Sequence, residues 1–169
     1  MGKGIGGHHQ PNEGKSNDWI TPKFIIDALG PFDLDPCMSL TQPWPTAVKG
    51  YTVNDDGFSR DWGNDRVFMN PPYGPHTGIW LEKLANHGNG IALIFARTDT
   101  KMFFDYVWRR ADACLFLEGR LYFHYPDGRK APANAGGPSV LVAYGENNVR
   151  CLKDCGLAGA FVRLKCDTP

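Results

Sequence analysis

The chain has 169 residues, of which 42% are hydrophobic and 12% aromatic. This length and composition fit one globular domain with its own core and exclude a disordered chain. Lysine plus arginine equals aspartate plus glutamate at 18 each, so no overall charge draws the protein to nucleic acid or to a membrane. The longest apolar run, residues 91–96, is far shorter than the roughly 20 residues of a membrane span.

Residues 1–18 are glycine-rich and polar and contain no apolar stretch, so we expect a flexible leader and no secretory signal. Residues 19–169 are expected to form one compact domain. The five cysteines are an odd number without a secreted context, which is typical of reduced thiols in a cytoplasmic protein. Cys151 and Cys155 can share one helix face, but no second pair accompanies them, so we expect no metal site.

Helical and strand patterns alternate along the rest of the chain. Thr21 predicts a helix N-cap, with Pro22 at the first helical position and Gly30 as the stop. Apolar spacing predicts two more helices, over residues 78–88 and 101–111. Strands are predicted over residues 32–35, 66–69, 90–96, 114–117, 121–125, 138–144 and 159–164. A loop-rich segment leads to residues 50–53, and a long loop covers residues 126–138.

This alternation predicts an α/β domain with a mostly parallel sheet and flanking helices. The continuous apolar run at residues 90–96 is typical of a central parallel strand that is buried on both faces. In such a sheet, ligands bind at the carboxyl ends of the strands. Polar residues that directly follow a buried strand are therefore the first candidates for a functional site.

The stretch Asn70-Pro71-Pro72-Tyr73 follows one such strand. Proline has a fixed φ and no N–H, so this corner presents carbonyl groups and withholds donors. The Asn70 side-chain oxygen and the Pro71 carbonyl can both accept hydrogen bonds from one primary amine, and the Tyr73 ring can stack on a planar base. The alternative is a plain loop with two prolines and a core tyrosine.

Those four residues are similar to the catalytic signature of the amino-methyltransferases that use S-adenosylmethionine. The surrounding sequence resembles one compact subgroup, the phage-type DNA N6-adenine methyltransferases. The matching stretches run in family order and include GIGGHHQ, DWITPKFIIDALGPFDLDPC, DGFSRDW, VFMNPPYG, WLEKLANHG, ALIFARTDT, FLEGRLYFH and PSVLVAYG.

The resemblance implies a single-domain, Rossmann-like methyltransferase fold that acts on a flipped-out adenine in DNA, inside a bacterial host cell. It gives Asn70, Pro71, Pro72 and Tyr73 the catalytic role. It implies that S-adenosylmethionine is held at its methionine end by Thr21, Pro22, Asp35, Pro36 and Cys37, and at its adenine by Asp56, Gly57 and Phe58. A carboxylate at Asp35 suits the ammonium group of the cofactor. The ribose contacts stay unassigned.

A modest excess of basic side chains lies between residues 97 and 130. Arg120, Arg129 and Lys130 flank the 121–125 segment and the long loop, where they can contact DNA phosphates beside a stacking platform. A solvated surface of mixed charge is the alternative. Arg97 follows the 90–96 strand and is expected at the pocket, although Asp99 or Thr100 can simply cap the next helix.

No separate target-recognition domain is expected, because the chain after Tyr73 is used to complete the sheet. We therefore expect a short or relaxed recognition sequence that is read by loops. Two other functions stay open: a methyltransferase that acts on glutamine in proteins or on bases in RNA, and a methyltransferase-like protein that binds nucleic acid without catalysis. The oligomeric state stays open between a monomer and a weak dimer.

Overall fold

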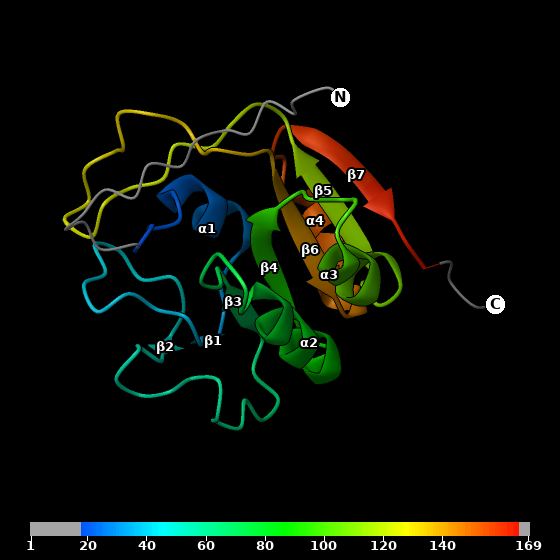
Figure 1. Ribbon diagram of the computed structural model, residues 1–169, viewed down its shortest axis with the longest axis horizontal. Helices are drawn as coiled ribbons and strands as arrows, with labels where there is room; N and C mark the ends of the chain where they lie inside the picture. The colour runs from blue at the N-terminus through cyan, green and yellow to red at the C-terminus, as the bar shows by residue number, and fades with distance from the viewer. Residues whose placement is uncertain (1–17, 166–169) are drawn as a thin grey trace, which may run out of the picture.

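Seven strands form a single sheet in the order β2-β1-β3-β4-β6-β5-β7 in the computed structural model, which describes residues 18–165 (Figure 1). The strands are β1 (Leu34–Asp35), β2 (Lys49–Gly50), β3 (Val67–Met69), β4 (Gly90–Phe95), β5 (Ala113–Leu117), β6 (Ser139–Tyr144) and β7 (Gly159–Arg163). The helical elements are α1 (Lys23–Leu29), α2 (Thr77–His87), α3 (Lys101–Phe103), the π-helix η1 (Phe104–Trp108) and α4 (Glu146–Asp154). Nearly all of the expected leader lies outside the described residues.

The α/β prediction is confirmed, but only one half of the sheet is parallel. Strand β1 pairs in parallel with β2 and β3, and β3 pairs in parallel with β4. The pairings of β4 with β6, β6 with β5 and β5 with β7 are antiparallel. The reason is that no helix connects β5 to β6. The chain returns through a loop at the same edge of the sheet, so β6 inserts between β4 and β5 in the opposite direction.

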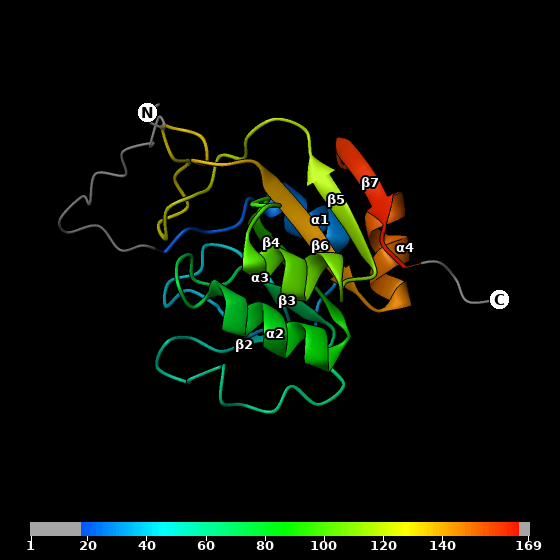
Figure 2. The ribbon, with the colours of Figure 1, turned by 45° about the vertical axis from the view of Figure 1, so that its right-hand side comes forward.

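Strict alternation along the central strands divides the core between the two faces of the sheet. On β4, Ile91 and Leu93 join one cluster, while Ala92 and Ile94 join the other. The first cluster is covered by α1 and α4, and the second by α2, α3 and η1. Figure 2 shows α2 and α3 on the near face, with α1 behind the sheet. The sheet is therefore the middle layer of three. The helices cover its two faces, and the loops at the carboxyl ends of the strands remain available for a functional site.

The helix predictions need three corrections. Helix α1 begins after Pro22, which is the N-cap and makes no side-chain capping bond, so Thr21 is not the cap. The third predicted helix is a single turn that continues as the π-helix η1. Helix α4 was not predicted, because Asn148 occupies an inward-facing position. Its side chain is buried and bonds to Arg66, Asn89 and the Tyr144 carbonyl.

The predicted strand at residues 121–125 is wrong. This segment has the alternation of a strand, since Leu121 and Phe123 point into the core. However, it makes only two isolated bridges, from His124 to Ile20 and to Lys130. The backbone folds back on itself, with Ala131 N–H donating to Phe123 O at 2.8 Å. Residues 126–138 form the loop that the sequence predicts, apart from the bridge at Lys130.

Candidate active site

The Asn70–Tyr73 corner leaves the sheet at the carboxyl end of β3. The Asn70 side-chain Nδ2 donates to the backbone carbonyl of Trp19 at 3.0 Å. The Asn70 Oδ1 is buried and has no hydrogen-bond partner among the described residues. The amide cannot reverse without bringing its oxygen against the Trp19 carbonyl oxygen, because two acceptors repel each other. The corner thus presents one buried acceptor whose orientation is fixed.

Tyr73 turns its ring toward the end of β4. The ring stacks on Phe95 with the centroids 4.5 Å apart and an interplanar angle of 24°. Its hydroxyl is buried without a partner in the described part of the chain, and this burial raises the pKa of Tyr73 well above its usual range. The hydroxyl therefore stays protonated at neutral pH. One face of the ring is already used by Phe95, so a planar base can stack only on the other.

The backbone of Pro72 and Gly74 is held by a residue that the sequence did not indicate. The hydroxyl of Thr77, the first residue of α2, donates to the Pro72 carbonyl at 2.8 Å and accepts from Gly74 N–H at 3.1 Å. Thr77 itself is buried. A threonine shortly after a proline pair is a weak local signal, because side chains of this type often bond to nearby backbone groups.

Asp35 ends β1 as a buried carboxylate. It accepts hydrogen bonds from the Thr46 hydroxyl and from Cys37 N–H. Burial raises the pKa of Asp35 from 3.8 to about 6, although both hydrogen bonds act in the opposite direction. Thr46 lies eleven positions further along the chain, and no local pattern marks it as a partner. The turn after β1 contains no residue with a positive φ, so it requires no glycine.

The Asp56–Phe58 segment packs directly against that turn. A Cβ on Gly57 would lie 2.3 Å from the Pro36 carbonyl oxygen, so only glycine fits there. Asp56 is exposed, has a φ of 51°, and accepts a hydrogen bond from the Ser59 hydroxyl at 2.6 Å. The Phe58 ring is 37% exposed. The fold therefore brings two stretches, Asp35–Cys37 and Asp56–Phe58, into contact.

Thr21 and Pro22 are both buried at the start of α1. The Trp44 indole N–H donates to the Thr21 carbonyl at 3.0 Å. Because Trp19 bonds to Asn70, this segment lies beside the Asn70–Tyr73 corner. The contacts connect Thr21 and Pro22 to the corner and do not show a direct contact with Asp35.

The four basic candidates differ in their surroundings. The Arg97 guanidinium carbon lies 5.9 Å from the centroid of the Phe95 ring on which Tyr73 stacks, which brings Arg97 beside the corner. Thr100 caps α3 by accepting from Phe103 N–H, so a capping role in this turn is confirmed for Thr100. The other three lie on or next to the long loop: Arg120 bonds to the Ala135 carbonyl, Arg129 is paired with Asp127, and Lys130 lies over the Tyr122 ring.

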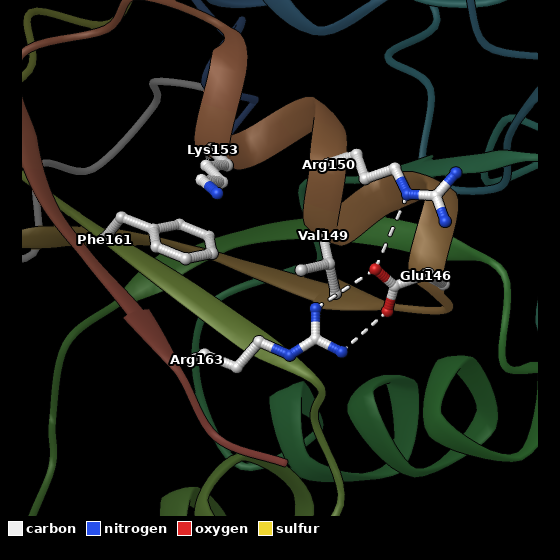
Figure 3. Close-up of a pocket in the computed structure, with 6 residues that line it drawn as sticks. All are labelled: Glu146, Val149, Arg150, Lys153, Phe161 and Arg163. Carbon is white, nitrogen blue, oxygen red and sulfur yellow. Dashed lines mark hydrogen bonds and ion pairs between the residues drawn. The ribbon is translucent and has the colours of Figure 1, made fainter. Parts of the chain in front are cut away.

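Two surface hollows are lined by none of the site residues predicted from the sequence, although Thr46, the partner of Asp35, lines the second. One of about 490 Å³ lies between α4 and β7, where Arg163 and Arg150 both reach Glu146 (Figure 3). The other, of about 420 Å³, is lined by residues of α1 and of the segment before β2. Within residues 18–165, no group of three or more histidine, cysteine, aspartate or glutamate side chains is arranged to hold a metal ion. The same residues contain no helix with the length and apolarity needed to cross a membrane.

The fold and the corner together define a class. An α/β sheet that carries Asn-Pro-Pro-Tyr at the carboxyl end of a central strand, with a buried carboxylate at the end of β1, is the architecture of an amino-methyltransferase that uses S-adenosylmethionine. A model of the family "DNA N-6-adenine-methyltransferase (Dam)" matches residues 8–150, and the chain belongs to that family. It is therefore a DNA adenine methyltransferase with S-adenosylmethionine as its cofactor. No curated protein and no solved structure matches the chain.

Proposed function

We propose that this chain methylates N6 of an adenine that is flipped out of the DNA duplex, with Asn70 as the residue that binds the target amine. One observation carries the proposal: the Asn70 Oδ1 is buried without a partner among residues 18–165, while its Nδ2 is bound to the Trp19 carbonyl. A buried acceptor without a partner costs free energy in the empty protein. A donor that arrives with the substrate, such as an exocyclic N–H, removes that cost.

The adenine amine is a poor nucleophile because its lone pair is delocalised into the ring. Hydrogen bonds from its two N–H groups to the Asn70 Oδ1 and the Pro71 carbonyl hold them out of the base plane and localise the lone pair on nitrogen. S-adenosylmethionine supplies an electrophilic methyl group. The N–C bond forms as the S–C bond breaks, and the methylated nitrogen then releases a proton to water. In this proposal the face of the Tyr73 ring opposite Phe95 stacks on the base.

The residues around β1 are proposed to bind the cofactor, and the charge of Asp35 suits its ammonium group. Asp35 provides a buried carboxylate for its ammonium group, beside Pro36 and Cys37, and Thr21 and Pro22 cover the same end. Asp56 accepts a hydrogen bond from its adenine, and the half-exposed Phe58 ring covers that base. The contact between Gly57 and the Pro36 carbonyl supports this assignment, because it brings both groups of residues to one side of the sheet.

The Asp56 assignment predicts weaker cofactor binding in Asp56→Ala, by roughly 1.5–3 kcal/mol for a charge-assisted hydrogen bond. Isothermal titration with S-adenosylmethionine measures this. Ser59→Ala is the matched control, because it removes the Asp56–Ser59 hydrogen bond and leaves the carboxylate in place. Equal weakening in both variants would mean that Asp56 only supports its own turn, and an unchanged dissociation constant in Asp56→Ala would remove it from the site.

DNA is held at the carboxyl edge of the sheet by Arg97 beside the corner and by Arg120, Arg129 and Lys130 around the long loop. The ion pair between Arg129 and Asp127 reduces the charge that Arg129 offers to a phosphate. Lys130 makes no ion pair within the described residues, so it is the strongest phosphate contact of the loop. The loops around these basic residues read the target sequence in this proposal, which favours a short or relaxed target sequence.

We predict a shallow salt dependence of DNA binding, with a slope of roughly −2 to −4 in log affinity against log salt, because few phosphates are neutralised. Changing Arg129 and Lys130 together to alanine should flatten the slope by about 1 to 2 units, equally on every DNA sequence. Fluorescence anisotropy on two unrelated duplexes measures this across a salt series.

Lys153→Ala is the control for that series, because Lys153 lies on α4 beside the hollow in Figure 3. It should leave the slope unchanged. Arg97→Ala should lower turnover and leave the slope nearly constant, because Arg97 lies at the pocket. An unaltered slope in the double variant would mean that DNA binds to another surface.

The function as a whole is tested with tritiated S-adenosylmethionine and with DNA, RNA and protein acceptors in parallel, followed by nucleoside analysis. We expect label in DNA, as N6-methyladenine. Label in RNA or protein alone would contradict the proposal. The resemblance to phage-type enzymes further supports a phage or prophage origin and action on DNA in the cytoplasm of a bacterial host.

A further inference from the structure

Trp19 lies between the catalytic corner and the long loop. Its neighbour Ile20 exchanges two backbone hydrogen bonds with His124, at 2.9 and 3.0 Å. The Trp19 ring packs on Tyr125 with the centroids 5.6 Å apart. Figure 1 shows the start of the described chain, in blue, beside the yellow loop. The Trp19 backbone is therefore held on one side by the segment that carries the basic residues.

On its other side, the Trp19 carbonyl receives the Asn70 Nδ2 at 3.0 Å. An asparagine amide has a donor end and an acceptor end, and a carbonyl oxygen binds only the donor end. The position of this one carbonyl thus decides which end of Asn70 stays free. If the carbonyl moved away, the amide could rotate and present N–H groups to the target amine, which would repel it.

We propose that Trp19 is a positioning residue for methyl transfer: its backbone carbonyl orients the Asn70 amide, and its indole, packed on Tyr125, keeps that carbonyl in place. The inference rests on the proposed role of Asn70 as the acceptor of the target amine. It deepens that role, since it makes the orientation of Asn70 depend on the segment that contacts the long loop.

The contact between the Trp19 indole and Tyr125 also connects the orientation of the Asn70 amide to the long loop at residues 126–138. The Arg129 guanidinium carbon lies 5.6 Å from the centroid of the Tyr125 ring, and Tyr125 packs on Trp19. Trp19 is 40% exposed, so it is not a core residue whose loss would leave a large cavity. Its truncation should therefore change the geometry at Asn70 more than the stability of the fold.

The first test is kinetic. Trp19→Ala should lower kcat on the order of 10- to 100-fold, as expected when a catalytic group is misplaced, and leave cofactor affinity within about twofold. Trp19→Phe keeps an aromatic ring on Tyr125 and should recover most of the lost activity. Tyr125→Ala removes the other half of the contact and should also lower kcat, whereas Tyr125→Phe should not. Phe104→Ala is the control, because Phe104 is a similarly exposed aromatic residue, at 45%.

Three kinetic outcomes would overturn the proposal: unchanged kcat in Trp19→Ala, an equal loss of kcat and cofactor affinity, or no recovery in Trp19→Phe. The second test does not depend on activity. The side-chain amide resonances of Asn70, identified by their absence in Asn70→Ala, should show a hydrogen-bonded proton in the wild type and lose it in Trp19→Ala. An identical amide signal in both proteins would refute the positioning role.

The two tests separate this inference from the proposed function. If the wild type forms no N6-methyladenine, the proposed function fails, and the amide signal still reports whether Trp19 orients Asn70. If the wild type methylates DNA and Trp19→Ala does so equally well, the proposed function stands and the positioning role fails. If Trp19→Ala does not fold, Tyr125→Ala decides, because it leaves Trp19 in place.

Discussion

Replacing Asn70 with alanine should lower kcat by about 10²- to 10³-fold, comparable to the loss of a preorganised group that acts on the developing charge. S-adenosylmethionine affinity should stay within about twofold, because Asn70 is assigned to the target amine and not to the cofactor. The reason lies in the Asn70 Oδ1, the buried acceptor without a partner in the described chain. A methylation assay beside isothermal titration measures both quantities.

Two controls make the Asn70 result specific. Alanine also removes the bond to the Trp19 carbonyl, which contributes about 0.5–1.5 kcal/mol, but it removes the unpartnered Oδ1 as well, so the stability measured by thermal unfolding should fall by no more than that amount. Asn70→Asp has the same shape and keeps an acceptor but lacks the donor for Trp19, so its activity should fall between those of the wild type and Asn70→Ala. Equal losses of activity and cofactor affinity would mean that the corner has only a structural role.

The second large effect is a pH dependence of cofactor binding that comes from Asp35. Burial raises the pKa of Asp35 to about 6 in the free protein. A cationic ammonium group prefers the ionised carboxylate, so binding should lower that pKa. Below pH 6 a proton competes with the cofactor, and the dissociation constant should rise about tenfold for each pH unit. Above pH 6 this carboxylate should contribute no further dependence.

The raised pKa of Asp35 also makes the cofactor-free protein less stable as the pH rises. Because the pKa of Asp35 in the folded protein lies above its usual value of 3.8, the folded state favours the protonated form. The stability that the protonated Asp35 gives the folded protein is fully present below pH 3.8 and is lost as the pH rises to about 6. Above that, the buried charge costs on the order of 3 kcal/mol of stability.

Titration with S-adenosylmethionine between pH 4.5 and 7 measures the predicted change in affinity. Asp35→Asn is the control: it cannot ionise, so its weakened binding should vary little with pH. A dissociation constant of the wild type that stays flat below pH 6 would show that Asp35 does not face the ammonium group. The prediction is then wrong even if Asp35→Asn binds poorly, because a structural loss alone produces no such pH profile.

The sequence by itself determined the elements whose signals are local. Short runs of apolar and β-branched residues predicted β3, β4, β5, β6 and β7 to within two residues at each end, because such runs favour strands over helices. The αL cap at Gly88 ended α2 as predicted. The Asn70–Tyr73 corner was found at the end of a strand because proline excludes a continued ladder.

The tertiary structure decided the pairing partners. No local pattern indicates that β6 lies between β4 and β5 and runs antiparallel to both. Its position and direction depend on how the chain returns through the connecting loop. Residues 121–125 have the alternation of a strand, yet their backbone partners are mostly their own loop and Ile20. Helix α4 was not predicted because Asn148, a polar residue, occupies one of its buried positions and interrupts the apolar pattern. Arg66 and Asn89, which bond to Asn148, are distant in the sequence.

The same division holds at the candidate site. The identity of Asn70 and of the residue that ends β1, Asp35, was readable from the sequence, because each directly follows a run of strand-forming residues. Their partners were not. Trp19 is separated from Asn70 by 51 positions, and Thr46 reaches Asp35 only after the chain has formed a loop. The sequence thus determined which chemical groups stand at the carboxyl edge, and the tertiary structure decided how they are oriented, because orientation depends on contacts between segments that no local periodicity encodes.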